Sequence, residues 1–432
     1  MLERVEIEEK QLSDYRDIVG DEVLEEIRSL AEPLKGARVL HINATAYGGG
    51  VAEILTPLAP LMQDAGLTCE WRVIEASDEF FKVSKACHNG LQGMDLELND
   101  EMRDIWKRNN EMNAAKLDGT YDFIVVHDPQ PAGLLHYAQP DHGRHWIWRC
   151  HIDTSDPNPD FWSFFTPYIG LYETTIFTME QFIGPDLDSE RVVIITPTID
   201  PLKPKNQPKP RDRARATVAE FGPDPERPLI TQVSRYDPWK DPLGVIDAYR
   251  IVKEEIPDVQ LALVGAMATD DPEGWSYLEK TIRHAGDDYD IFIPHNFHGV
   301  SGEEVGAFQA GSEVIVQKSL REGFGLTVTE GMWQARPVVG GAVGGIKVQI
   351  ADGETGFLVD SVAACARAIH YLLTHPEEAD AMGKAGREQV REHYLITRHL
   401  TDYLRLFNIL EDRQELATPE RRTEPVQAQE GN

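Results

Sequence analysis

Short apolar segments alternate with segments of helical periodicity through most of this 432-residue chain. Apolar runs of about four to eight residues, separated by longer stretches with apolar residues at helical spacing, are typical of βαβ units built on a parallel sheet. A chain of this length also exceeds what one hydrophobic core usually organises. The pattern therefore predicts two doubly wound, Rossmann-like α/β domains that face each other across a cleft.

The expected strands fall into two series, one after the other along the chain. The first series is residues 37–44, 69–75, 122–128, 145–153, 174–179 and 192–197, and the second is residues 229–235, 259–265, 290–295, 313–318, 337–341 and 356–359. Open α/β sheets bind ligands at the carboxyl ends of their strands. Functional side chains are therefore expected on the loops that follow these strands.

A segment rich in Pro and Lys separates the two series. Its prolines cannot donate the hydrogen bonds of a sheet and favour an extended backbone, which predicts an interdomain linker. A final stretch with helical spacing could pack back on the first domain, and the residues after it have too few large apolar side chains to order themselves. The predicted boundaries are 1–200 for the first domain, 201–213 for the linker, 214–394 for the second domain, 395–411 for the final helix and 412–432 for a disordered tail.

The formal net charge of −31 restricts the partners of the chain. Nucleic-acid affinity depends on clusters of Lys and Arg that neutralise phosphates, so nucleic acid is not expected as a partner. The four cysteines are widely spaced, which argues against a disulfide framework and a zinc site. The N-terminus lacks the layout of a signal peptide, and no apolar run reaches about 18 residues. These features predict a cytoplasmic protein without a membrane partner.

The strongest motif, REGFGLTVTEGMW, follows a predicted strand and leads into a predicted helix. Gly323 and Gly325 allow the backbone to approach a ligand closely, and a helix that begins near Leu326 offers unpaired N–H groups to a diphosphate. The carboxylates of Glu322 and Glu330 only accept hydrogen bonds, so they suit the hydroxyls of a sugar and a ribose. Taken alone, the motif also fits a tight turn with solvated glutamates. Together with the next motif it predicts a site for a glycosylated nucleotide.

The next motif, SRYDPWKDP, follows the first strand of the same domain, so the two loops are expected to converge. Arg235 offers a planar fork of N–H donors and Lys240 offers a point charge, a combination that suits two adjacent phosphates. We therefore expect these two residues to bind a diphosphate rather than to form a surface salt bridge.

Polar and glycine-rich loops also end strands of the first domain. Gly48, Gly49 and Gly50 precede a helix that begins near Val51, where they form either a tight turn or a loop that closes over donor phosphate and acceptor. Other polar residues placed at the edge of the cleft are His127, Asp128, His151 and Asp153. For each histidine a structural hydrogen bond and a functional role are both open. No metal site is predicted, because no His or carboxylate cluster with ligand spacing accompanies them.

Arg235 and Lys240, followed by two glutamates that seven residues separate, resemble the retaining GT-B glycosyltransferases of family 4. The resemblance implies that Arg235 and Lys240 hold the donor diphosphate and stabilise the leaving nucleotide. It also implies that Glu330 binds the ribose and that Glu322 contacts the transferred sugar. Backbone contacts are implied for Phe324, Gly325 and Leu326.

Several narrower segments resemble the trehalose glycosyltransferring synthases. They are GGGVAEIL, FFKVSKACHNGLQG, HDPQP, WRCHID, QKSLREGFGLTVTEGMW and GGIKVQIADGETGFLV, between about residues 37 and 360. The resemblance implies reversible transfer of glucose, with retention of configuration, from a nucleoside-diphosphate glucose to free glucose, without a cofactor or an essential metal. One departure is Lys347, because many family 4 enzymes carry an acidic residue shortly after the preceding glycine pair.

Two alternatives stay open at this point. A retaining trehalose phosphorylase that uses glucose 1-phosphate would need many of the same phosphate contacts, and a catalytically silent nucleotide- or glycan-sensing module could share the fold. The neutral sugar is the expected acceptor, because the loops around Asp128 carry few cations for a sugar phosphate. The expected partners are a nucleotide sugar and a small sugar acceptor, and the sequence leaves a homodimer open.

Overall fold

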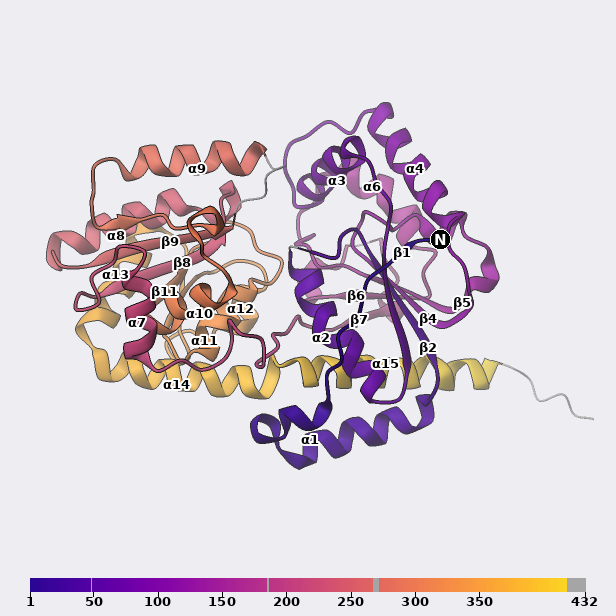
Figure 1. The fold of residues 1–432 in the computed structure, drawn as a ribbon. Helices are drawn as coiled ribbons and strands as arrows, with labels where there is room; N and C mark the ends of the chain where they lie inside the picture. The colour runs from indigo at the N-terminus through magenta and orange to yellow at the C-terminus, as the bar shows by residue number, and fades with distance from the viewer. Residues whose placement is uncertain (48, 185, 267–271, 418–432) are drawn as a thin grey trace, which may run out of the picture.

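The computed structural model describes residues 1–47, 49–184, 186–266 and 272–417. Two α/β domains lie side by side, each built around a largely or wholly parallel sheet (Figure 1). The first sheet runs in the order β1 (Glu3–Arg4), β3 (Thr68–Val73), β2 (Arg38–Asn43), β4 (Tyr121–His127), β5 (Gly143–Arg149), β6 (Thr174–Phe177) and β7 (Val192–Ile194). The second runs in the order β10 (Ile291–Phe292), β9 (Gln260–Ala266), β8 (Leu229–Arg235), β11 (Val314–Gln317), β12 (Val338–Gly341) and β13 (Phe357–Val359). The predicted fold class is confirmed.

Most helices lie between successive strands, as doubly wound sheets require, whereas α13 (Val362–Thr374), α14 (Pro376–His393) and α15 (Ile396–Ala417) follow the last strand. In the first domain the connecting helices are α1 (Arg16–Ala31), α2 (Gly50–Asp64), α3 (Asp78–Leu91), α4 (Asp100–Ala114), α5 (Leu134–Tyr137) and α6 (Pro159–Ile169). Those that follow are α7 (Arg211–Ala219), α8 (Pro242–Glu255), α9 (Pro272–Ala285), α10 (Gly302–Gly311), α11 (Leu326–Trp333) and α12 (Ile346–Gln349).

Most strand ends differ from the expected ranges by a few residues, and three of the differences have a clear physical reason or a consequence for the site. The two-residue strand β1, which pairs antiparallel with β3, was not expected, because two residues carry no readable periodicity. Strand β10 ends at Phe292 rather than residue 295, since Pro294 follows and cannot donate a ladder hydrogen bond. Strand β5 ends at Arg149 rather than residue 153. The segment after Arg149 instead turns toward the second domain and forms part of the site described below.

The last helix returns from the second domain to the first. In Figure 1, α14 and α15 run beneath both domains, and α15 packs against α1 and α2. Its buried residues Leu400, Tyr403 and Phe407 belong to the core of the first domain, where the Phe407 ring stacks on Phe123 at 4.1 Å between centroids. The helix continues to Ala417, so residues 412–417 are helical rather than disordered as expected. The remainder of the predicted tail, 418–432, lies outside the described residues.

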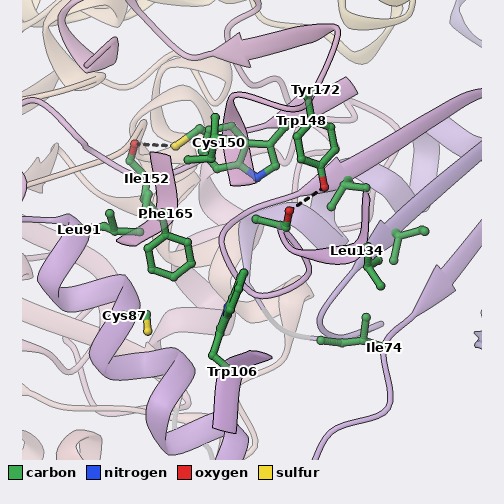
Figure 2. Packing of buried hydrophobic residues seen from close by; sticks show 14 of the residues in the cluster. Ile74, Cys87, Leu91, Trp106, Leu134, Trp148, Cys150, Ile152, Phe165 and Tyr172 are labelled. Atoms are coloured by element: carbon green, nitrogen blue, oxygen red, sulfur yellow. Dashed lines mark hydrogen bonds between the residues drawn. The ribbon is translucent and has the colours of Figure 1, made fainter. Parts of the chain in front are cut away.

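An aromatic cluster supports the end of β5. Trp106 of α4 is fully buried and meets Phe165 of α6 edge-on, and Figure 2 shows both rings below Trp148 and Cys150. The Cys150 thiol donates to the Ile152 carbonyl at 3.6 Å. Because close-packed aromatic clusters tolerate little movement, this cluster fixes the position of the loop after β5, whose residues Cys150 and Ile152 pack in it.

Candidate active site

A cavity of about 670 Å³ lies between the carboxyl ends of the two sheets. Both domains contribute to its wall. The predicted site residues that line it are Gly49, Gly50, His127, Asp128, His151, Arg235, Lys240, Glu322, Gly323, Phe324, Gly325, Leu326 and Glu330. Gly48 lies outside the described residues. The structure therefore brings together, in one cavity, residues as far apart in sequence as Gly49 and Glu330.

Lys240 and Glu322 join the two loops of the second domain. The Lys240 ammonium lies 2.6 Å from Oε2 of Glu322, and the Ser319 hydroxyl donates to the same oxygen at 3.0 Å. The Asp237 carboxylate accepts the backbone N–H groups of Trp239 and Lys240, which fixes the short turn that carries the lysine. An ammonium has three donors, so Lys240 can keep its contact with Glu322 and still donate to a ligand oxygen.

Arg235 is more open to the cavity than Lys240. Its side chain is 64% exposed, and its nearest carboxylate oxygen, on Asp237, lies 3.5 Å away. Ion pairs of this exposure contribute little to stability, so little is lost when the guanidinium turns to another anion. Burial raises the pKa of Asp237, partly offset by the charges of Lys240 and Arg235. The fork of Arg235 is thus available to a ligand in the cavity.

The glycines of the REGFG turn have separate roles. Gly325 has φ +87° at the start of α11, a left-handed conformation that side chains disfavour. Position 323 has no room for a side chain, because a Cβ there would lie 2.4 Å from the His151 carbonyl oxygen of the other domain. The turn therefore presents the N-terminus of α11 to the cavity and also touches the first domain.

Glu330 is almost fully buried and already has a cationic partner. Its Oε1 lies 2.7 Å from the Lys205 ammonium, which also lies 3.2 Å from Oε2 of Glu53 in α2. Burial lowers the pKa of Lys205, but the two carboxylates outweigh that effect and raise it. Glu53 also pairs with Lys203. These lysines come from the predicted linker, so an ionic cluster connects the linker and both domains at the wall of the cavity.

Asp128 adopts an unusual backbone conformation at the end of β4. Its φ of +66° lies in the left-handed region, which non-glycine residues occupy mainly at functional or tightly constrained positions. Its Oδ1 accepts the backbone N–H of His151 at 2.8 Å. Burial raises the pKa of Asp128 to about 7, although that hydrogen bond and the charge of Arg149 lower it. The carboxyl therefore changes its charge near neutral pH.

The two predicted histidines lie one behind the other. His151 is half-buried, and its Nε2 lies 2.9 Å from Nδ1 of His127. His127 is 1% exposed, and its Nε2 lies 3.0 Å from Nδ1 of His41 in β2. Burial lowers the pKa of both His127 and His151 well below the usual range. Both imidazoles are therefore uncharged at neutral pH.

The expectation that Asp153 lies at the edge of the cleft is wrong. Its side chain is 4% exposed, and Oδ1 accepts the backbone N–H and the hydroxyl of Ser155. It does not line the cavity, within the part of the chain that the structure describes. Because β5 ends earlier than expected, Asp153 falls in a turn that its own carboxylate stabilises.

Sequence reasoning left several cavity residues without a role. His88 and Gln92, from the FFKVSKACHNGLQG segment, both line the cavity. Burial, and to a smaller extent the charge of Arg235, lowers the pKa of His88 to about 4. Arg321 enters the cavity from the second domain and lies 3.3 Å from Asp156 of the first. Arg149, at the end of β5, is fully buried and does not line the cavity. Arg321 could have been predicted as a cavity residue, because it directly precedes Glu322 in the REGFG turn.

The described residues contain no group of three or more His, Cys, Asp or Glu side chains placed to hold a metal ion. None of their helices combines the length and the hydrophobicity that crossing a bilayer requires.

Two Rossmann-like α/β domains, whose strand ends enclose a cavity between them, form the GT-B fold of glycosyltransferases. The sucrose-phosphate synthase of Thermosynechococcus elongatus shares this fold, with a TM-score of 0.69 and 17% identity over 87% of this chain and all of that one. Residues 215–389 match the family "Glycosyl transferases group 1", and residues 41–184 match "Trehalose synthase, N-terminal domain".

Curated relatives narrow the class. The trehalose synthase of Thermococcus litoralis is 52% identical over 403 residues, which cover 93% of this chain and 97% of the relative. A trehalose phosphorylase from Pleurotus pulmonarius is 26% identical over 85% of this chain and 56% of its own length. The chain belongs to the trehalose synthase family, and its activity is a trehalose-related glycosyl transfer.

Asp128→Asn should alter how stability depends on pH. In the wild type the pKa of Asp128 in the folded state, about 7, exceeds its ordinary value, so ionisation destabilises the fold as pH rises from about 4 to 7. Asn keeps an oxygen for the His151 N–H and tolerates positive φ. We expect the variant to gain stability over the wild type on the order of 2 kcal/mol at pH 7.5 and little at pH 4.5. Urea unfolding at both pH values measures this, and an equal difference at the two would contradict it.

Proposed function

We propose that this protein transfers glucose from a nucleoside-diphosphate glucose to free glucose, which gives trehalose with retention of configuration in a reversible reaction. The observation that carries the proposal is the pairing of Lys240 with Glu322 beside the open guanidinium of Arg235, inside a cavity between the domains. Its volume of about 670 Å³ suits a small-molecule ligand. The identity to the trehalose synthase of Thermococcus litoralis supports the product.

The residues that would bind the donor are the charged residues of the second domain that line the cavity. Arg235, Lys240 and the N-terminus of α11 would meet the diphosphate. As the bond between the sugar C1 and the phosphate oxygen breaks, negative charge grows on the departing diphosphate, and fixed cations stabilise it most at that stage. Glu322 would hold Lys240 in position and accept a sugar hydroxyl. Glu330, with Lys205 on Oε1 and the Gln309 amide 3.4 Å from Oε2, would accept ribose hydroxyls on the remaining lone pair of Oε2.

The acceptor side follows from the first domain. Asp128 ends β4 with its carboxyl at the cavity, where it would exchange hydrogen bonds with hydroxyls of glucose. Its raised pKa makes it a weak nucleophile near neutral pH. We therefore propose front-face displacement: the acceptor oxygen forms the new bond to C1, and its proton passes to the departing phosphate oxygen. The chain's own cations stabilise the leaving group in this scheme, which requires neither cofactor nor metal.

Free glucose is the proposed acceptor rather than glucose 6-phosphate. A phosphate dianion in a closed site needs several cations. Arg149 is fully buried, and Arg321, which lies 3.3 Å from the exposed Asp156 carboxylate, would be a single cation for it. The negative charge of Asp128, when ionised, would also repel a second phosphate.

Product analysis tests the proposal. The enzyme is supplied in turn with UDP-, ADP- or GDP-glucose and with equal amounts of glucose and glucose 6-phosphate, and the products are separated. We expect mainly trehalose and one nucleoside diphosphate, because the site offers cations for one diphosphate. Predominant trehalose phosphate would overturn the acceptor assignment. Product from glucose 1-phosphate with release of inorganic phosphate would indicate a phosphorylase, and no product from any donor would indicate a sensing module.

Variants of Lys240 and Glu330 should differ in which kinetic constant they change. Lys240→Ala should lower kcat/KM about 10²-fold or more with a large fall in kcat, because Lys240 faces charge that grows in the transition state. Glu330→Gln should mainly raise the donor KM, because ribose contacts are similar in ground and transition states. Steady-state kinetics with varied donor separates the two. A collapse of kcat in Glu330→Gln with an unchanged donor KM would refute the ribose assignment.

A further inference from the structure

Three imidazoles form one continuous chain from the core of the first domain to the cavity. His41 lies in β2, His127 ends β4, and His151 follows β5, so they come from three neighbouring strands. Nδ1 of His41 lies 3.0 Å from Nε2 of His127, and Nδ1 of His127 lies 2.9 Å from Nε2 of His151. At these distances each contact is a hydrogen bond, so one nitrogen of each pair carries the proton and the other accepts.

All three rings are uncharged. His41 and His127 are at most 1% exposed, and burial lowers the pKa of His41 to about 3. A neutral imidazole has one N–H and one lone pair. The chain therefore has only two complete arrangements, in which every proton points either toward the cavity or toward the core.

The inner end of the chain distinguishes these arrangements. Nε2 of His41 is buried and has no hydrogen-bond partner among the described residues. If the protons point toward the core, this nitrogen is an unpaired N–H. If they point toward the cavity, it is an unpaired lone pair. Buried N–H groups without a partner are the rarer and more costly case.

The nearest ring does not reverse this preference. Tyr403 of α15 meets His41 edge-on, with 5.8 Å between centroids. An aromatic face accepts an N–H only weakly compared with a carbonyl or carboxylate oxygen. The arrangement with protons directed toward the cavity is therefore favoured.

We infer that His127, held by His41, is a positioning residue that fixes His151 with an unprotonated Nε2 and a protonated Nδ1. His151 is one of the residues that line the cavity, and its Nδ1 has no hydrogen-bond partner among the described residues. His151 then donates a hydrogen bond to a substrate oxygen, either a hydroxyl or a phosphoryl oxygen. At Nδ1 it is neither a general base nor a nucleophile. This role in turnover rests on the proposed function, whereas the protonation state does not.

The protonation state is measured on the free enzyme. Protein labelled with ¹⁵N-histidine is examined by long-range ¹H–¹⁵N correlation, in which protonated and unprotonated ring nitrogens have distinct shifts, and His151 is assigned by its absence in His151→Gln. We expect Nδ1–H for His151, His127 and His41. Protonation of His151 at Nε2 would overturn the inference, whether or not the enzyme makes trehalose.

Two substitutions of His127 by side chains of equal shape, Asn and Asp, test whether His127 sets the protonation state of His151 and thereby kcat. In His127→Asn the amide nitrogen can replace Nδ1–H as donor, whereas in His127→Asp the carboxylate can only accept, so it should draw the His151 proton to Nε2. We expect kcat to stay within about fivefold of wild type in His127→Asn and to fall roughly tenfold or more in His127→Asp, because a wrong tautomer removes the donor. Folding of each variant is checked by its melting temperature.

A matched control separates this effect from the loss of a buried ring. His145 of β5 is 2% exposed and bonds to Glu173, away from the cavity. His145→Asn should leave the His151 protonation state and kcat unchanged. If His127→Asp moves the proton to Nε2 without lowering kcat, His151 is not the proposed donor. If His127→Asp does not fold, the ¹⁵N measurement on the wild type and the kcat of His127→Asn still decide the inference.

Discussion

The site depends on one close contact between the domains, that of the turn around Gly323 with the His151 carbonyl. A side chain at 323 would begin 2.4 Å from that oxygen, so the turn can approach only because it lacks one. This approach places Lys240 and Glu322 of the second domain in the same cavity as Asp128 and His151 of the first. The loop that carries His151 is held from behind by the cluster around Trp106 (Figure 2). Each domain alone would contain only half of the cavity.

The distribution of charge fits a chain that is acidic overall but must bind an anion. The Lys and Arg side chains among the described residues that line the cavity are each paired: Lys240 with Glu322, Lys205 with Glu330, Arg321 with Asp156, and Arg235 loosely with Asp237. Such pairs limit the cost of holding cations in a partly buried site before a ligand arrives. Because its ion pair with Asp237 is exposed, Arg235 can exchange that carboxylate for a phosphate at little cost in free energy. The first domain instead contributes neutral imidazoles and a carboxyl that titrates near neutral pH, which suits an uncharged sugar.

Much of the fold was predictable from the sequence because buried parallel strands form short apolar runs with regular spacing. The loops after those runs contained most of the residues that line the cavity. Lys205 was not predictable as a site residue, because a lysine in a proline-rich linker has no pattern that shows which carboxylates it meets. The chain of histidines was also hidden, since His41 lies inside a strand and its contacts depend on register. Asp153 was misplaced because β5 ends early, and strand ends are set by tertiary contacts rather than by local propensity.

The most direct test of the account is the effect of Gly323→Ala on transfer and on nucleotide binding measured side by side. The added Cβ must displace the turn from His151, and misplacement of about 1 Å can cost on the order of 10²-fold in rate. Gly311→Ala, where a Cβ meets only ordinary contacts at 3.4 Å, is the control for an added methyl group in the same domain. The account predicts that Gly323→Ala lowers kcat/KM for trehalose formation about 10²-fold, while the nucleoside diphosphate of the donor binds the second domain within about threefold of wild type by calorimetry. A normal rate of transfer in Gly323→Ala would contradict the claim that this contact assembles the site.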